Sequence, residues 1–282
     1  MAERLSIETP AKLNLMLNIT GRRADGYHLL ETAFQFVDWC DRIEFAVTDD
    51  GRLERRSGPA EIEPESDLVM LAARALRARS GSDLGAIIDV EKHIPAGGGL
   101  GGGSSDAAAC LLALNSLWQL DYSLEQLAEI GLELGADVPV FVRGQAAWAT
   151  GVGEDLQPLD LPEPYFLIIN PGVSVPTAAV FGAEELTRNN DAITIRAFLR
   201  GAGENVCEPV VRNRYPEVGS ALDWLQQFAD ARMSGTGGCV FAAFDSLNRA
   251  EELKSRVPEQ WGAQVARALN RNPVHRQLGL SV

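Results

Sequence analysis

The chain has 282 residues, 46% of them hydrophobic, which is enough for one large core or for two smaller cores flanking a cleft. Its 39 acidic and 25 basic side chains leave a formal net charge of -14. That charge argues against nucleic acid or an anionic membrane surface as partner, so any phosphate must be bound locally by backbone N–H groups and one or two placed cations.

The cysteines and the N-terminal residues indicate a reducing compartment. Cys40, Cys110, Cys207 and Cys239 are widely scattered and show no C-x-x-C spacing, so we expect buried thiols with no disulfide or metal role. Charges within the opening MAERLSIE interrupt what would be the apolar part of a signal peptide, and no apolar stretch approaches the ~20 residues of a membrane span. We therefore expect a cytoplasmic protein.

Residues 4–47 have the pattern of strands. In KLNLMLNI, leucines and an isoleucine alternate with Lys12, Asn14 and two other residues, which predicts one core face and one mixed polar face. The segment TGRRADGYH predicts a loop, and LETAFQFV predicts the next strand. Lys12 and Asn14 share the face opposite the leucines, so both can point into a cleft.

Helices and strands are then expected in turn up to residue 150. Ser66 or Asp67 can cap a helix through LVMLAARALRA, and GAIIDVEKHI predicts a strand. After the loop PAGGGLGGG, an amphipathic helix is expected from Ser104. Ser123 and Gln126 fit the capping box of another helix, which is expected to end at Gly135. AAWAT then predicts a strand.

The segment 151–164, GVGEDLQPLDLPEP, is rich in glycine, proline and acidic residues and suggests a boundary between domains 1–155 and 156–282. Beyond it, YFLIIN predicts a strand and PTAAVFGAEEL, DAITIRAFLRG and PEVGSALDWLQQF predict helices. ARM and CVFAAF predict strands on either side of the loop MSGTGG. Without a regular βαβ alternation, the fold class is α+β.

The most informative segment is the glycine-rich loop. Six of the nine residues from Gly97 to Ser105 are glycine, and a helix follows at once, so backbone N–H groups and the positive end of the helix dipole can approach an anion. The loop contains G-x-G-x-x-G, but the βαβ array of a dinucleotide-binding domain is missing, and no lysine precedes Ser104 as in a Walker A loop. The candidate ATP-binding residues are Pro95, Ala96, Gly97, Gly98, Gly99, Leu100, Gly101, Gly102, Gly103, Ser104 and Ser105.

PAGGGLGGGSSDAA resembles a signature of the GHMP kinases, in the version found in diphosphocytidyl-methylerythritol kinases. Three more blocks resemble their other signatures in the same order: PAKLNLMLNITGRRADGYHLLETAFQFVDWCD, LGADVPVFVRG and MSGTGGCVF. The resemblance covers almost the whole chain. It implies a two-domain α+β fold with the active site in the interdomain cleft, and an ATP-dependent kinase that phosphorylates the 2-hydroxyl of a cytidine-diphosphate methylerythritol with Mg²⁺.

The resemblance further implies catalytic roles for Lys12 and Asp137. A kinase must position the acceptor, neutralise charge and accept the hydroxyl proton, and a carboxylate beside an ammonium suits that task. By position alone, Asp137 is equally well a helix N-cap and Lys12 a solvated lysine of an edge strand. The metal ligands and the oligomeric state stay open.

Substrate recognition is implied for Tyr27 and His28, which match residues that contact cytosine, and for Phe181, which matches the opposite aromatic wall. Asn14 and Thr177 match further substrate-contacting positions. Taken alone, Phe181 is equally a helix core residue, and Tyr27 and His28 ordinary loop residues.

The second glycine-rich turn, with Gly235, Thr236 and Gly237, matches a loop that supports the first; the alternative is a simple tight hairpin. Asp67 departs from the pattern, since relatives often carry Asn there beside the nucleotide. Rival functions are another GHMP kinase with a different alcohol substrate and a nucleotide-binding protein without catalysis.

Overall fold

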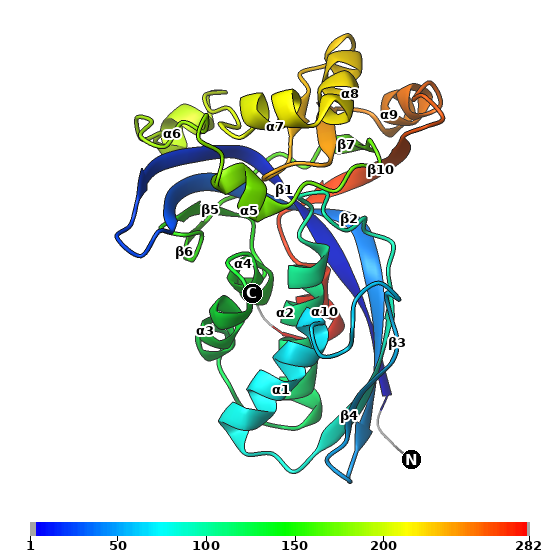
Figure 1. Cartoon of the computed structure of the whole chain (residues 1–282). Coiled ribbons are helices and arrows are strands. Elements are labelled where there is room, and N and C mark those ends of the chain that lie inside the picture. The colour runs from blue at the N-terminus through cyan, green and yellow to red at the C-terminus, as the bar shows by residue number, and fades with distance from the viewer. Residues whose placement is uncertain (1–3, 281–282) are drawn as a thin grey trace.

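The computed structural model describes residues 4–280, and Met1–Glu3 of the segment tested for a signal peptide lie outside this range. Its ten-stranded sheet and surrounding helices confirm the predicted α+β class. The sheet order is β3-β4-β2-β10-β7-β9-β8, with β1 paired to β2 and β5 paired to both β2 and β6. In Figure 1, β1 and β2 run along the whole molecule and connect a lower group of helices to an upper one.

The hairpin of β1 (Arg4–Arg22) and β2 (His28–Thr48) confirms the predicted strands and the loop between them. The predicted single leucine face is wrong, because register shifts interrupt the pairing, one of them between Asn14 and Leu17. Leu13 packs with β7 and β9 residues in a central cluster, whereas Leu17 and Ile19 pack into the core of the upper half.

The lower half contains β3 (Leu53–Ser57), α1 (Leu68–Ser80), β4 (Gly85–Glu91), α2 (Gly102–Leu117), α3 (Leu124–Leu134) and α4 (Val138–Arg143). Asp67 caps α1, and the predicted capping box at the start of α3 is present. Helix α2 begins two residues before Ser104 and is buried around most of its surface, so its predicted amphipathic character is wrong. It is enclosed because α1, α3 and α4 pack on it and β1 and β2 lie behind it.

The middle of the chain contains β5 (Ala147–Thr150), β6 (Asp155–Pro158) and β7 (Tyr165–Asn170). The segment 151–164, predicted to be a boundary, therefore contains a strand, which pairs with β5. The predicted helices PTAAVFGAEEL and DAITIRAFLRG are shorter than expected, because only α5 (Thr177–Phe181) and α6 (Ile195–Phe198) within them are helical.

The upper half is completed by α7 (Glu208–Arg214), α8 (Pro216–Gln226), β8 (Arg232–Met233), β9 (Val240–Phe244), α9 (Leu247–Lys254) and β10 (Gly262–Leu269). The last helix, α10 (Pro273–Gln277), returns to the lower half beside β1 (Figure 1). The sequence patterns did not predict β3, α7, α9, β10 or α10.

The molecule has two large hydrophobic cores, one in its lower half and one in its upper half. The lower core lies between α1–α4 and the sheet and includes Val274 of α10. The upper core lies under α7, α8 and α9 and includes Leu17 and Ile19 of β1. Division of the chain at residue 155 stays a prediction. Among residues 4–280, no helix is both long enough and apolar enough to cross a membrane.

Candidate active site

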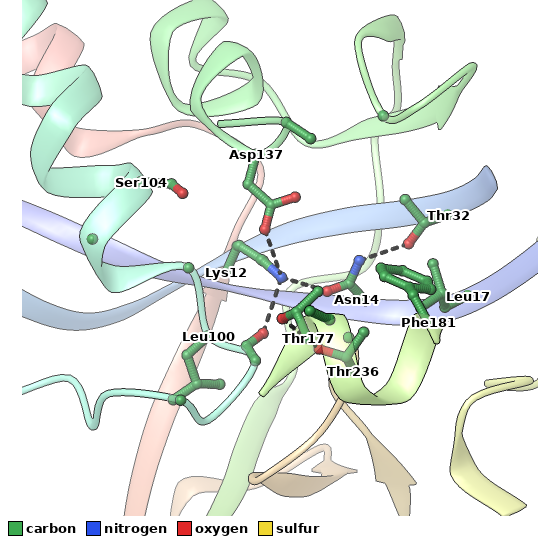
Figure 2. Close-up of a pocket in the computed structure, with 18 of the residues that line it drawn as sticks. Lys12, Asn14, Leu17, Thr32, Leu100, Ser104, Asp137, Thr177, Phe181 and Thr236 are labelled. Carbon is green, nitrogen blue, oxygen red and sulfur yellow. Dashed lines mark hydrogen bonds and ion pairs between the residues drawn. The ribbon is translucent and has the colours of Figure 1, made fainter. Parts of the chain in front are cut away.

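A cavity of about 1030 Å³ lies where the two halves of the molecule meet. Its walls come from β1, β2, the glycine-rich loop, the first turn of α2, the residue before α4, α5 and the second glycine-rich turn (Figure 2). Of the predicted site residues, all line this cavity except two: Ser105, which is 1% exposed, and Gly237, which packs against Met233 and Val211.

The glycine-rich loop has a shape that other residues resist. Gly97, Gly99 and Gly101 have φ of 68°, 74° and 71°, in the left-handed region that favours glycine. A Cβ on Gly99 would lie 2.2 Å from the carbonyl oxygen of Ser234, and one on Gly101 would lie 2.9 Å from Cε of Lys12. Close packing against the second turn and against Lys12 therefore requires glycine at these positions.

The N-terminus of α2 opens onto the cavity. Gly101 occupies its N-cap position and has no side chain to satisfy the first N–H groups of the helix. Gly102, Gly103 and Ser104 of the first turn all line the cavity. Uncapped N–H groups at the positive end of a helix dipole bind anions, so this end of α2 can hold phosphate oxygens.

Lys12 is the buried cation of the site, with only 3% of its side chain exposed. Its Nζ donates to the carbonyl oxygen of Gly99 at 2.9 Å and to Oδ1 of Asn14, and it lies 3.2 Å from Oδ2 of Asp137 (Figure 2). The ring centroid of Phe34 is 5.5 Å away. The predicted solvated edge-strand alternative is therefore wrong, because β1 carries Lys12 into the interior, where three oxygen atoms surround its ammonium group.

Asp137 precedes α4 at the N-cap position, but its carboxylate makes no capping hydrogen bond there. The side chain turns to Lys12 instead and remains 34% exposed, on the wall of the cavity. A partly exposed carboxylate paired with a buried ammonium can both contact a hydroxyl and accept its proton.

The second glycine-rich turn holds the first in place. The hydroxyl group of Ser234 donates to the carbonyl oxygen of Gly99 at 2.9 Å and accepts from the backbone N–H of Asn14 at 3.1 Å. The N–H of Cys239 donates to the carbonyl of Gly98 at 3.0 Å. Burial raises the pKa of the Cys239 thiol to about 12, so this residue packs under the loop as a neutral group.

Polar side chains continue from Lys12 along the floor of the cavity. Asn14 donates from Nδ2 to Oγ1 of Thr32 at 2.9 Å, which leaves its Oδ1 facing Lys12. The hydroxyl oxygens of Thr177 and Thr236 lie 2.9 Å apart and connect α5 to the second turn (Figure 2). Hydroxyl and amide groups in this row suit a polyol or a phosphate, since they can both donate and accept.

The aromatic residues form the far wall. The rings of His28 and Phe181 stack with centroids 5.1 Å apart and an interplanar angle of 25°, so no base fits between these two rings in this conformation. Tyr27 is 65% exposed and is the ring left free to cover a base from the other side. Burial, together with Arg188 and Arg22, lowers the pKa of His28.

Sequence patterns missed a buried charge cluster behind the loop. Lys92 bonds Asp41 and, at 2.7 Å, Oδ2 of Asp106, while Thr9 donates to Oδ1 of Asp106 at 2.6 Å. Burial raises the pKa of Asp106 to about 6, with Lys92 opposing the shift and the like charge of Asp41 adding to it. The sequence does show Lys92 just before the glycine-rich loop and Asp106 just after it, but only the fold brings the two side chains into contact.

Both carboxylate oxygens of Asp67, the residue that departs from the family pattern, contact other residues of this chain. Its Oδ1 accepts from the N–H of Val69 and caps α1, and its Oδ2 pairs with Arg55 at 2.5 Å. Both side chains are at least 90% buried. The negative charge that an Asn would lack is therefore neutralised within this chain by Arg55.

Family models match both halves of the chain. The model of the GHMP kinases N terminal domain matches residues 67–145, and that of the GHMP kinases C terminal domain matches residues 183–263. A solved structure of 4-(cytidine 5'-diphospho)-2C-methyl-D-erythritol kinase superposes with a TM-score of 0.82 at 32% identity, covering 94% of this chain and 99% of that one. Homoserine kinase from Cytophaga hutchinsonii, with a TM-score of 0.71 but 18% identity over 96% of each chain, shares the fold.

The 4-diphosphocytidyl-2-C-methyl-D-erythritol kinase of Nitrosococcus oceani is 57% identical over 261 residues, 93% of each chain. The Pseudomonas aeruginosa protein of the same name is 49% identical over 278 residues, 99% of each chain. With this identity over nearly its whole length, the chain belongs to the 4-diphosphocytidyl-2-C-methyl-D-erythritol kinase family of the GHMP kinases.

Proposed function

We propose that the protein transfers the γ-phosphoryl group of ATP to the 2-hydroxyl of 4-diphosphocytidyl-2-C-methyl-D-erythritol, in the non-mevalonate route to isoprenoid precursors. Family membership at 57% identity supports the reaction. The observation that carries its placement is the Lys12–Asp137 pair, with 3.2 Å between Nζ and Oδ2, in a cavity that the uncapped end of α2 also lines.

In this reaction ATP places its phosphates at the glycine-rich loop, where backbone N–H groups replace the basic patch that the acidic chain lacks. The acceptor hydroxyl lies against Asp137, which takes its proton as the oxygen attacks the γ-phosphorus. The bond from that phosphorus to the bridging oxygen of ADP breaks, and ADP keeps the electron pair. Lys12 offsets the negative charge on the transferring group, so the main contributions are positioning and electrostatic stabilisation.

We further propose that Mg²⁺ accompanies ATP. Residues 4–280 contain no group of three or more His, Cys, Asp or Glu side chains arranged to hold a metal. The Ser104 hydroxyl and the Asp137 carboxylate, both on the cavity wall, are oxygen donors of the kind that Mg²⁺ prefers and would help to hold an ion that enters with the nucleotide. When bound, the ion neutralises phosphate charge.

The cytidine group provides the specificity in this proposal, because a small flexible polyol offers few distinguishing contacts. Tyr27 and Phe181 supply stacking surfaces, and His28 supplies a hydrogen-bonding edge. We also propose a cytoplasmic location, which is supported by four cysteines that are all free thiols.

An ADP-release assay on three acceptors tests the proposal: the cytidine substrate, its uridine analogue and free methylerythritol phosphate. We expect the highest kcat/KM for the cytidine compound. Phe181→Ala should raise the KM for this compound roughly 5- to 150-fold, the equivalent of about 1 to 3 kcal/mol of stacking, and should leave the KM for ATP unchanged. Equal efficiency on all three acceptors would leave only a generic GHMP kinase.

A further inference from the structure

Arg188 connects His28 and Phe181 of the cavity wall and was not predicted to belong to the site. Its Nε donates to Nε2 of His28 at 3.1 Å, and its Nη2 donates to the carbonyl oxygen of Phe181 at 2.9 Å. Further bonds to the carbonyl groups of Ala183 and Leu186 fix the guanidinium itself. One side chain thus joins the start of β2 to the C-terminal end of α5.

This contact determines which nitrogen of His28 carries the proton. A guanidinium can only donate hydrogen bonds, so Nε2 of His28 must accept, and a ring that accepts at Nε2 is neutral and holds its proton on Nδ1. Nδ1 makes no hydrogen bond with residues 4–280, although the ring lines the cavity. It is therefore a donor available to a ligand.

The charges around His28 favour the same neutral form. Arg188 lies behind the ring, and Arg22 faces it from the end of β1, on the same cavity wall. Asp25, the acidic residue of the intervening loop, also lines the cavity but pairs with Arg23. Burial and the charges of Arg188 and Arg22 lower the pKa of His28, so the ring remains uncharged near neutral pH.

A donor at Nδ1 distinguishes the two pyrimidines. N3 of cytosine is a hydrogen-bond acceptor, whereas N3 of uracil carries a proton and donates. With its proton on Nδ1, His28 can pair with the cytosine edge and meets uracil donor to donor; with the proton moved to Nε2, the preference reverses. We propose that Arg188 is a positioning residue that selects cytosine over uracil by fixing the tautomer of His28. The inference rests on the proposed function, because it deepens the role of His28 in binding the substrate.

The tautomer can be observed directly in the wild-type protein, because the chain has only three histidines. In a sample labelled with ¹⁵N-histidine, NMR at pH 7.5 should show a protonated Nδ1 and an unprotonated Nε2 for His28, identified by loss of its signals in His28→Ala. Arg188→Leu should lose this single tautomer and raise the pKa of His28 towards its ordinary value. A wild-type His28 with its proton on Nε2 overturns the inference.

The kinetic test compares kcat/KM for the cytidine substrate and its uridine analogue. Leaving a base edge facing the wrong partner costs about 1 to 3 kcal/mol, so Arg188→Leu should reduce the cytidine-to-uridine ratio about 5- to 150-fold, mainly through KM. Its kcat at saturation and its KM for ATP should change little. Arg188→Lys keeps a charged donor, though without the fork, and should restore part of the preference.

Arg214→Leu is the matched control. Arg214 also holds α5, through the carbonyl group of Ala179 at 3.3 Å and through Glu185, but it does not contact His28. It should keep the wild-type ratio and tautomer. If Arg214→Leu lowers the ratio as much as Arg188→Leu does, α5 anchoring explains the effect and the tautomer mechanism is rejected.

Failure of this inference is separable from failure of the proposed function. If His28→Ala abolishes the cytidine preference and Arg188→Leu does not, the function stands and the role of Arg188 falls. If the wild-type enzyme does not distinguish cytidine from uridine, the cytidine-specific function itself falls. Should Arg188→Leu not fold, the wild-type tautomer and the Arg188→Lys ratio decide the question.

Discussion

Asp137 stands at the start of α4 without capping it, so its carboxylate can be changed with little effect on the helix. Asp137→Asn keeps size and shape but removes the proton acceptor, and we expect kcat to fall by about 10² to 10⁴ while the affinity for ATP is kept. Steady-state kinetics and ATP titration measure both. Asp155→Asn, on the exposed strand β6, should behave as wild type. If kcat falls by less than about fivefold in a folded Asp137→Asn protein, Asp137 is not the proton acceptor.

A side chain at Gly101 would be unfavourable for two reasons: the backbone angle is left-handed, and a Cβ would contact Lys12. Gly81 shares only the first of these, so it serves as the control. Both have left-handed φ, 71° and 67°, but a Cβ on Gly81 meets nothing within 4 Å, whereas one on Gly101 meets Lys12 at 2.9 Å. Each Gly→Ala change should cost about 1 to 2 kcal/mol of unfolding free energy from the backbone alone. Only Gly101→Ala should also weaken ATP binding, by about tenfold or more, as measured by calorimetry. Unchanged ATP affinity in Gly101→Ala would show that the loop does not hold phosphate.

At the scale of elements, Lys92 joins β4 to β1, β2 and α2, since it lies between Asp41 and Asp106, and Thr9 bonds Asp106. Lys92→Met leaves two buried carboxylates without a counter-charge, and we expect a loss of about 3 to 5 kcal/mol in unfolding free energy by urea titration. Arg56→Met breaks an exposed pair with Asp89 and should cost far less, because water screens that pair. Comparable losses in the two variants would mean that the cluster is not a buried network.

At the scale of the whole molecule, α10 near the C-terminal end of the chain packs against the N-terminal half. His275 of α10 is buried next to Gly144, and its Nε2 donates to the carbonyl oxygen of Val142 at 2.9 Å. Burial lowers the pKa of His275, with hydrogen bonds to Val142 and Phe141 opposing the shift. The unfolded chain therefore takes up a proton near pH 6.5 that the folded chain resists. Its contribution to stability is complete above this pH and is lost as the pH falls.

This pH dependence must be measured as a difference between two proteins. His28 contributes with the same sign, whereas Asp106, whose pKa is raised to about 6, stabilises the fold as the pH falls through that value. The substitution His275→Gln removes only the contribution of His275 and leaves those of His28 and Asp106 in place. Urea unfolding at pH 7.5 and 5.5 should show a larger stability loss for wild type than for His275→Gln, and equal losses would contradict the assignment.

Features that depend on a few neighbouring residues could be predicted from the sequence. The cap of α1 at Asp67 and the capping box of α3 are formed by groups two or three residues apart, so their patterns are visible in the chain. The glycine-rich loop is likewise local, because glycine is required by its backbone angles and the helix end follows at once. With the order of the motifs, this local information was enough for the family and the reaction class, and most of the residues predicted for the site line the cavity.

The tertiary structure alone decided how these parts meet. A register shift in β1 places Leu13 in the central cluster and Leu17 in the upper core, and no pattern of alternation in the sequence reveals it. The contacts of Arg188 with His28 and of Ser234 with Gly99 join residues more than a hundred positions apart, and many arginines and serines in the chain were equally eligible. Such pairings depend on which surfaces are brought together when the two cores form, because a polar side chain enters a buried site only where the fold provides its partner.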